Sequence, residues 1–175
     1  MDAMLVVDMQ VGLRNGDPKH DLPGVIDRIN RLAARIRAAS GTVIFVQHCG
    51  GEGDEFEPLT PGWALLPDLH RHPGDLVVRK TLNEPFTGTD LQARLDDIAP
   101  DRILITGWAT DLCVDSTVRS AVAHHHHVVV VADGHTLSDR PHLDAISVIR
   151  HHHWIWNNLL TDRSITVASA DELLA

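Results

Sequence analysis

The sequence of 175 residues lacks the features of several large protein classes. It has only two cysteines, which excludes a disulfide-stapled scaffold and favours reduced thiols in a cytoplasm. No stretch reaches the roughly 18 consecutive apolar residues of a membrane helix. The first residues, MDAMLVVDMQ, carry an acid at Asp2 and none of the basic residues that begin a secretory signal. We therefore expect a cytoplasmic protein that does not enter a membrane.

Positive charge is also scarce. Fifteen Lys and Arg stand against twenty-four Asp and Glu, which gives a net charge of −9. Such a surface repels phosphate backbones and anionic lipids, so we expect no nucleic-acid partner and no membrane-surface binding. Apolar residues make up 43% and charged residues 22%, as in ordinary globular proteins. No internal repeat or linker divides the chain, so the length predicts one domain over residues 1–175.

Short apolar runs alternate with segments whose apolar residues recur every three or four positions, as strands and helices do. The expected strands cover residues 3–8, 42–47, 76–80, 102–107, 128–133 and 164–167, and the expected helices 22–39, about 90–97, about 112–123 and about 141–157. This order predicts a three-layer α/β fold of the Rossmann-like type, with a mostly parallel open sheet of about six strands and helices on both faces. The long connection at 48–75 is of a length usually found in functional or mobile loops.

Three reactive side chains follow different strands of this predicted sheet. Asp8 ends the first strand, Lys80 ends the third, and Cys113 follows the fourth at the start of a helix. Taken singly, they read as a turn residue, a solvated strand end and a small buried residue. Together they lie at the carboxyl edge, where open α/β sheets bind ligands. A carboxylate could take the thiol proton, while an ammonium group and a helix N-terminus would lower the thiol pKa.

Three segments that contain these residues resemble one family. VVDMQ at 6–10, VVRKTLNEPFTGTDLQARL at 77–95 and ITGWATDLCVDSTVRSAV at 105–122 look like the isochorismatase-like cysteine hydrolases. The last segment is close to that family's G-x-A-T-[DN]-x-C-V signature. Order and spacing also agree, and the resemblance runs from Met4 to the final strand. It therefore supports the same fold class.

The resemblance implies a catalytic triad of Asp8, Lys80 and Cys113. It also implies a cis peptide bond between Trp108 and Ala109, and an oxyanion hole formed by the amides of Ala109 and Cys113. The implied reaction is hydrolysis of an amide or lactam C–N bond of a small molecule through a thioester on the cysteine. Two alternatives stay open, namely hydrolysis of a vinyl ether, as in isochorismate, and a catalytically silent binding or assembly module.

The connection after the second strand bears on metal and substrate. The nicotinamidase branch of the family holds zinc with an Asp-x-His pair and a second histidine there. The corresponding segment here, QHCGGEGDEFEPLTPGW at 47–63, has one histidine, His48, and no Asp-x-His pair. We therefore predict no metal and no cofactor. The pattern H-x-G…T-P-G-W resembles the short metal-free members, including those that act on streptothricin-type lactams.

Loop position suggests which residues surround a substrate. The candidates are Gln10, Leu13, His48, Trp63, Phe86 and Trp108. The Trp108 ring could face the pocket or pack under the sheet, and Phe86 could instead pack in support of Lys80. Cys49, in an acidic run that should raise a thiol pKa, is a rival nucleophile. The segment after the first strand has neither G-x-G-x-x-G nor G-x-x-x-x-G-K-[ST], which disfavours nucleotide binding.

Thirteen histidines are an unusual feature of the composition, and seven of them form the runs 124–127 and 151–153. The runs could capture a metal or respond to pH, or the first could simply end a helix, where imidazolium complements the helix dipole. His125 stands where the family usually has a helix-ending glycine, so we expect it to tolerate φ > 0. His151, Trp154 and Ile155 could form a subunit contact, and we expect a homo-oligomer (a dimer or larger).

Overall fold

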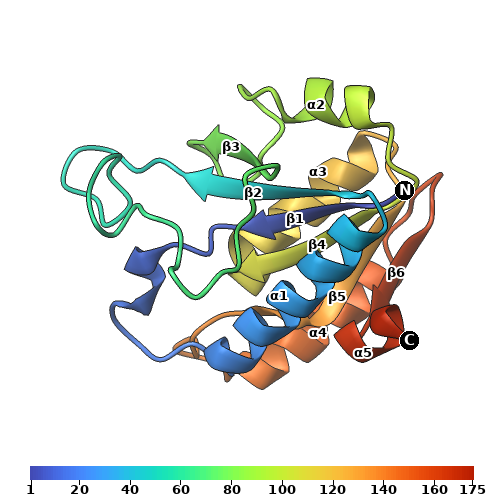
Figure 1. Cartoon of the computed structure of the whole chain (residues 1–175). Helices are drawn as coiled ribbons and strands as arrows, with labels where there is room; N and C mark the ends of the chain where they lie inside the picture. The colour runs from blue at the N-terminus through green and yellow to red at the C-terminus, as the bar shows by residue number, and fades with distance from the viewer.

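The computed structural model describes all residues, 1–175, and its centre is one parallel β-sheet (Figure 1). The strands are β1 (Ala3–Val7), β2 (Thr42–His48), β3 (Leu76–Lys80), β4 (Ile103–Trp108), β5 (Val128–Thr136) and β6 (Ile165–Ala168). They lie in the order β3-β2-β1-β4-β5-β6, and every pairing is parallel. The predicted six-stranded α/β sheet is confirmed.

Helices cover both faces of the sheet because the inner strands are apolar on both sides. On one face, α1 (Leu22–Ala38) and α5 (Ala170–Leu174) pack on Met4 and Val6 of β1. On the other face, α2 (Leu91–Ile98), α3 (Asp115–Ala123) and α4 (Ala145–Asn157) pack on the alternate residues of the same strand. The two cores explain why β1 reads as a continuous apolar run rather than an alternating one.

Several element ends differ from the prediction, and one helix was not predicted. Strand β5 continues past residue 133 to Thr136, because a register shift against β4 lets its polar end stay paired. Helix α4 begins at Ala145 rather than near 141, since the Asp144 side chain accepts a hydrogen bond from the Ser147 amide and caps it there. The short α5, capped by a reciprocal Ser169–Glu172 box, was not predicted because five residues are too few for a periodic pattern.

The first histidine run ends helix α3, as one interpretation predicted. His125 has φ +61°, and its amide donates to the Val122 carbonyl while the His126 amide donates to Ala121. These two bonds form a Schellman motif, in which a left-handed residue follows the helix. The prediction for His125 is therefore confirmed. No three His, Cys, Asp or Glu side chains gather as potential ligands of one metal ion.

The second histidine run, residues 151–153, lies on α4. His151 is exposed, whereas His152 and His153 are partly buried. The Trp154 side chain is 65% exposed, whereas Ile155 packs against the core beneath the sheet. Of the predicted subunit-contact residues, His151 and Trp154 face outward and Ile155 does not.

No helix combines the length and the apolar character needed to cross a membrane.

Candidate active site

Asp8, Lys80 and Cys113 come together at the carboxyl edge of the sheet. The strand order changes direction between β1 and β4, so the chains leaving these two strands diverge and open a crevice there. Asp8 directly follows β1, and Cys113 lies in a π-helical turn, η2 (Thr110–Val114), after β4. Lys80 is the last residue of β3 and reaches across the end of β2. The predicted grouping of these three side chains is thus present in the fold.

The Lys80 ammonium group lies between the other two side chains. Its Nζ is 2.7 Å from Asp8 Oδ2 and 3.4 Å from Cys113 Sγ, and it also donates to the Leu82 carbonyl at 3.0 Å. Asp8 and Lys80 are 1% and 2% exposed, so water screens this ion pair little. The other carboxylate oxygen, Asp8 Oδ1, has no hydrogen-bond partner. A buried anionic oxygen without a donor is costly, which makes it a natural acceptor for an incoming proton.

Burial dominates the electrostatics of the site. It raises the pKa of the Asp8 carboxyl above its usual range, although Lys80 opposes the shift. Burial, together with the negative charge of Asp8, also raises the pKa of the Cys113 thiol to about 12. The predicted lowering of the thiol pKa is therefore wrong for the resting protein. The ammonium group is present, but desolvation of the sulfur outweighs it, and the thiol is neutral at pH 7.

The turn that carries Cys113 begins with unusual backbone geometry. The peptide bond between Trp108 and Ala109 is cis. The Ala109 amide donates no hydrogen bond within the chain, whereas its carbonyl accepts from the amides of Leu112 and Val114. The Cys113 sulfur is partly accessible and lies 3.8 Å from the Asn83 side-chain oxygen. Asn83, in the loop after Lys80, was not predicted as a site residue.

Gln10 was predicted to bind substrate, but its side chain is fully engaged with the backbone. Its amide nitrogen donates to the carbonyls of His48 and Trp63, and its oxygen accepts from the His48 amide. With both protons used, Gln10 instead holds the chain after β1 to the end of β2 and to the loop 61–65. Sequence position alone could not separate these two roles.

His48 and Trp63 carry the other two buried polar side-chain atoms that lack a partner. The three such atoms of the chain are Asp8 Oδ1, His48 Nδ1 and Trp63 Nε1. Burial is the main cause that lowers the pKa of His48, with Lys80 adding to it, so its imidazole is neutral at pH 7. All three atoms belong to predicted site residues. Gln10 holds the backbone carbonyls of two of these residues, His48 and Trp63. His48 lies near enough to Asp8 and Lys80 for both charges to act on its pKa. The Trp63 ring instead lies against the Arg79 guanidinium at 4.9 Å and lines a different cavity.

An aromatic row lies beside these groups. The Trp108 ring is 5.9 Å from the Phe56 ring, which is 6.0 Å from His48. Trp108 is half-buried and packs against the core on the α1 side of the sheet, which agrees with the packing alternative left open for it. Phe56, in the loop 49–75, was missed because an isolated aromatic residue in a loop carries no periodic signal.

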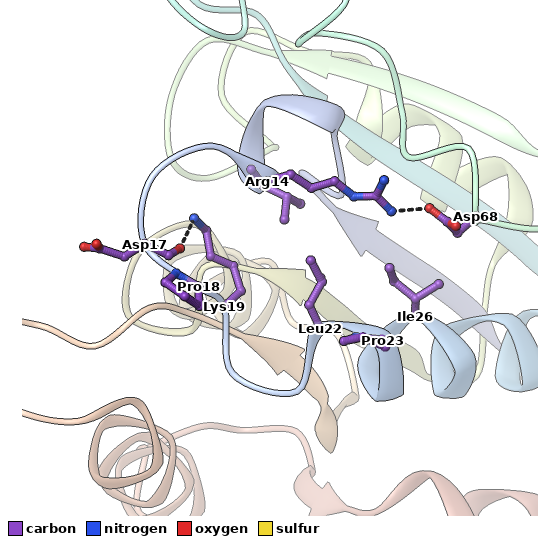
Figure 2. A pocket seen from close by; sticks show the side chains of 9 residues that line it. Arg14, Asp17, Pro18, Lys19, Leu22, Pro23, Ile26 and Asp68 are labelled. Atoms are coloured by element: carbon purple, nitrogen blue, oxygen red, sulfur yellow. Dashed lines mark hydrogen bonds and ion pairs between the residues drawn. The ribbon is translucent and has the colours of Figure 1, made fainter.

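Two other predicted substrate-binding residues, Phe86 and Leu13, do not contact Asp8, Lys80 or Cys113 through any hydrogen bond or ring contact. Phe86 is buried and stacks on His124 at 4.4 Å, which agrees with a packing role. Leu13 belongs to the core and lines a cavity of about 520 Å³ between its own 3-10 turn and the start of α1 (Figure 2). There Arg14 pairs with Asp68, and Lys19 folds back on its own loop. None of the three clustered residues Asp8, Lys80 and Cys113 lines that cavity.

The second thiol occupies a different position. The Cys49 amide donates to the Lys80 carbonyl at 2.8 Å, directly after β2, but no hydrogen bond joins its sulfur to Asp8 or to Lys80. Of the two cysteine sulfurs, only that of Cys113 contacts the ammonium group of Lys80. The geometry thus separates the two cysteines that the sequence left as rivals.

Comparisons with known proteins show the family of the chain. Residues 2–154 match the isochorismatase domain family. A streptothricin hydrolase of Streptomyces noursei is 35% identical over 148 residues, which are 84% of this chain and 54% of that protein. A ureidoacrylate amidohydrolase of Methylorubrum extorquens is 29% identical over 75% of this chain and 68% of its own length. The chain spans about half the length of the streptothricin hydrolase that it matches.

Solved structures show the same architecture. A crystal structure of an isochorismatase-family protein superposes with a TM-score of 0.86 at 31% identity, covering 96% of this chain and 98% of the other. The matched sequence runs from β1 into α4 and so includes every strand end that contributes to the site. The chain belongs to the isochorismatase family.

Proposed function

We propose that the chain is a cysteine amidohydrolase that cleaves the C–N bond of a small amide or lactam through a thioester on Cys113. The observation that carries the proposal is the position of Lys80 Nζ, within 2.7 Å of Asp8 and 3.4 Å of the sulfur. This arrangement provides a nucleophile, a base and a cation that stabilises both charged forms. Relatives named for streptothricin hydrolysis and for ureidoacrylate amidohydrolysis support the C–N bond as the target.

In the first step the neutral thiol attacks the substrate carbonyl. A thiol whose pKa is about 12 is not ionised in advance, so its proton passes to Asp8 as the C–S bond forms. The free oxygen Asp8 Oδ1 is the acceptor, since Oδ2 is engaged by Lys80. The raised pKa of Asp8 suits a group that must take up a proton and give it back near neutral pH.

The tetrahedral oxyanion then requires donors. The unengaged amide of Ala109 and the amide of Cys113 are the two that we assign to it. When the C–N bond breaks, the protonated Asp8 returns its proton to the nitrogen, and ammonia or an amine leaves. Asp8 next deprotonates a water molecule that attacks the thioester. The carboxylic acid is released, and the thiol regains its proton.

The test combines product release with detection of the intermediate. A panel of small amides, ureides and lactams is incubated with the protein, ammonia or amine is quantified, and acid-quenched samples are examined by peptide mass spectrometry. We expect an acyl adduct on the peptide that contains Cys113, and loss of release in Cys113→Ala. The matched control is Cys49→Ser, which should keep full activity. Undiminished release by Cys113→Ala would refute covalent catalysis. No release from any compound by the wild-type chain would favour the vinyl-ether or silent-module alternatives.

A further inference from the structure

The short turn that carries Cys113 is held from outside at three points. Arg140, in the loop before α4, forms two hydrogen bonds to Asp111 at 2.8 and 2.6 Å. Trp156 of α4 donates from its indole nitrogen to Asp115 at 2.8 Å. The third contact is to Thr110, at the start of the turn, and it comes from a buried histidine on β5.

This third contact is part of a row of three hydrogen-bonded side chains, Thr110, His135 and His153. Thr110 Oγ1 is 2.9 Å from His135 Nδ1, and His135 Nε2 is 3.2 Å from His153 Nε2 on α4. Thr110 and His135 are 0% and 1% exposed. His135 also meets the Trp156 ring edge-on at 5.2 Å, so the histidine and the indole support the two ends of the turn together.

The contacts couple the protonation of the two histidines. Between two neutral imidazole rings, one Nε2 donates and the other accepts. The Thr110 hydroxyl can take either role towards His135 Nδ1. The tautomer of His135 therefore depends on both of its partners.

The register of the sheet explains why a histidine reaches this place. Ile105 pairs with Val130, but Gly107, two residues later, pairs with His135. The extra residues of β5 form a bulge that brings His135 beneath the turn following β4. On the side of β1, position 107 has no room for a side chain, because a Cβ there would lie 2.1 Å from the Val7 carbonyl oxygen.

We propose that Thr110, His135 and His153 form a relay of positioning residues that sets Cys113 against Lys80. None of the three touches the reacting atoms. Their effect is exerted through the turn Thr110–Val114, whose first residue they hold. Arg140 holds Asp111, the second residue of the turn, and Trp156 holds Asp115, the residue that follows it. This inference rests on the proposed function only in assuming that the contact between Lys80 and the Cys113 sulfur matters chemically.

A double-mutant cycle tests the relay without a substrate. The rate of Cys113 alkylation by iodoacetamide is measured by peptide mass spectrometry, with Cys49 as the internal reference. In the otherwise wild-type chain, Lys80→Met should slow alkylation at least about tenfold, because a nearby cation shifts a thiol pKa by about one to three units. In the Thr110→Val background the same change should have an effect of less than about twofold, since the sulfur no longer contacts Lys80.

Two controls separate positioning from general destabilisation. Thr110→Ser keeps the hydroxyl and should restore the full effect of Lys80→Met. Ile29→Ala, in the core on the opposite face of the sheet, lowers stability without touching the turn and should also preserve it. Should Lys80→Met alone fail to fold because Asp8 is left unpaired, the cycle is run in an Asp8→Asn background. Asp8→Asn alone is then the reference, because removing Asp8 itself lowers the thiol pKa.

The outcomes distinguish the two proposals. A Lys80 effect that disappears in Thr110→Val but persists in both controls supports the relay. A Lys80 effect that persists in Thr110→Val overturns the relay and leaves the proposed function standing. Absence of any Lys80 effect in the wild-type background overturns the triad, and the relay with it.

Discussion

Acidification should destabilise this protein through His135. Burial, and to a smaller degree the neighbouring His153 and His152, lowers the pKa of His135 from 6.5 to about 3. The folded chain therefore binds this proton less readily than the unfolded chain. The stability that depends on the neutral ring is fully present above about pH 6.5 and is lost as pH falls from there towards 3. At pH 5 the group has passed about 1.5 units below its unfolded pKa, which corresponds to about 2 kcal/mol.

Urea unfolding at pH 7 and pH 5 measures this loss. The wild-type chain should lose about 2 kcal/mol more than His135→Gln between the two values, or about 4–8 °C in thermal midpoint for a chain of this size. The difference between the two proteins isolates one histidine from the other twelve. His142→Gln, which changes an exposed histidine, is the matched control and should behave as wild type. Equal losses in wild type and His135→Gln would refute the assignment of a buried neutral imidazole.

Two further predictions concern Cys113 and His125. Burial and Asp8 raise the pKa of the Cys113 thiol to about 12, so the rate of Cys113 alkylation should still rise above pH 9. Asp8→Asn should shift this pH–rate profile to lower pH. A rate that reaches a plateau below pH 8 in the wild-type chain would contradict this prediction. His125→Gly should leave the melting temperature unchanged or raise it, since glycine removes the cost of φ +61°, roughly 1 kcal/mol, while only an exposed pair with Asp162 is lost. His124→Gly, at the preceding position with φ −90°, should show no such gain, and a clear loss of stability in His125→Gly would count against the strain argument.

The sequence was informative wherever a property depends on neighbours along the chain. Apolar runs and helical periodicity identified all six strands and the four longer helices, because burial on one or two faces leaves a repeating pattern. Asp8 and Lys80 could be grouped because parallel strands end at one edge of a sheet. His125 could be assigned to a left-handed position because the family that the sequence resembles usually has a helix-ending glycine there.

Properties that depend on segments distant in the sequence needed the fold. The pKa of Cys113 depends on how deeply its sulfur is buried beside Asp8, and no local pattern states that depth. Gln10 binds backbone rather than a ligand because β2 and the loop 61–65 meet it in space. The bulge that brings His135 under Thr110 exists only when β4 and β5 pair. The sequence by itself thus determined the architecture and the reactive residues, whereas the tertiary structure decided their protonation and their partners, since desolvation and hydrogen bonding arise only when distant segments pack together.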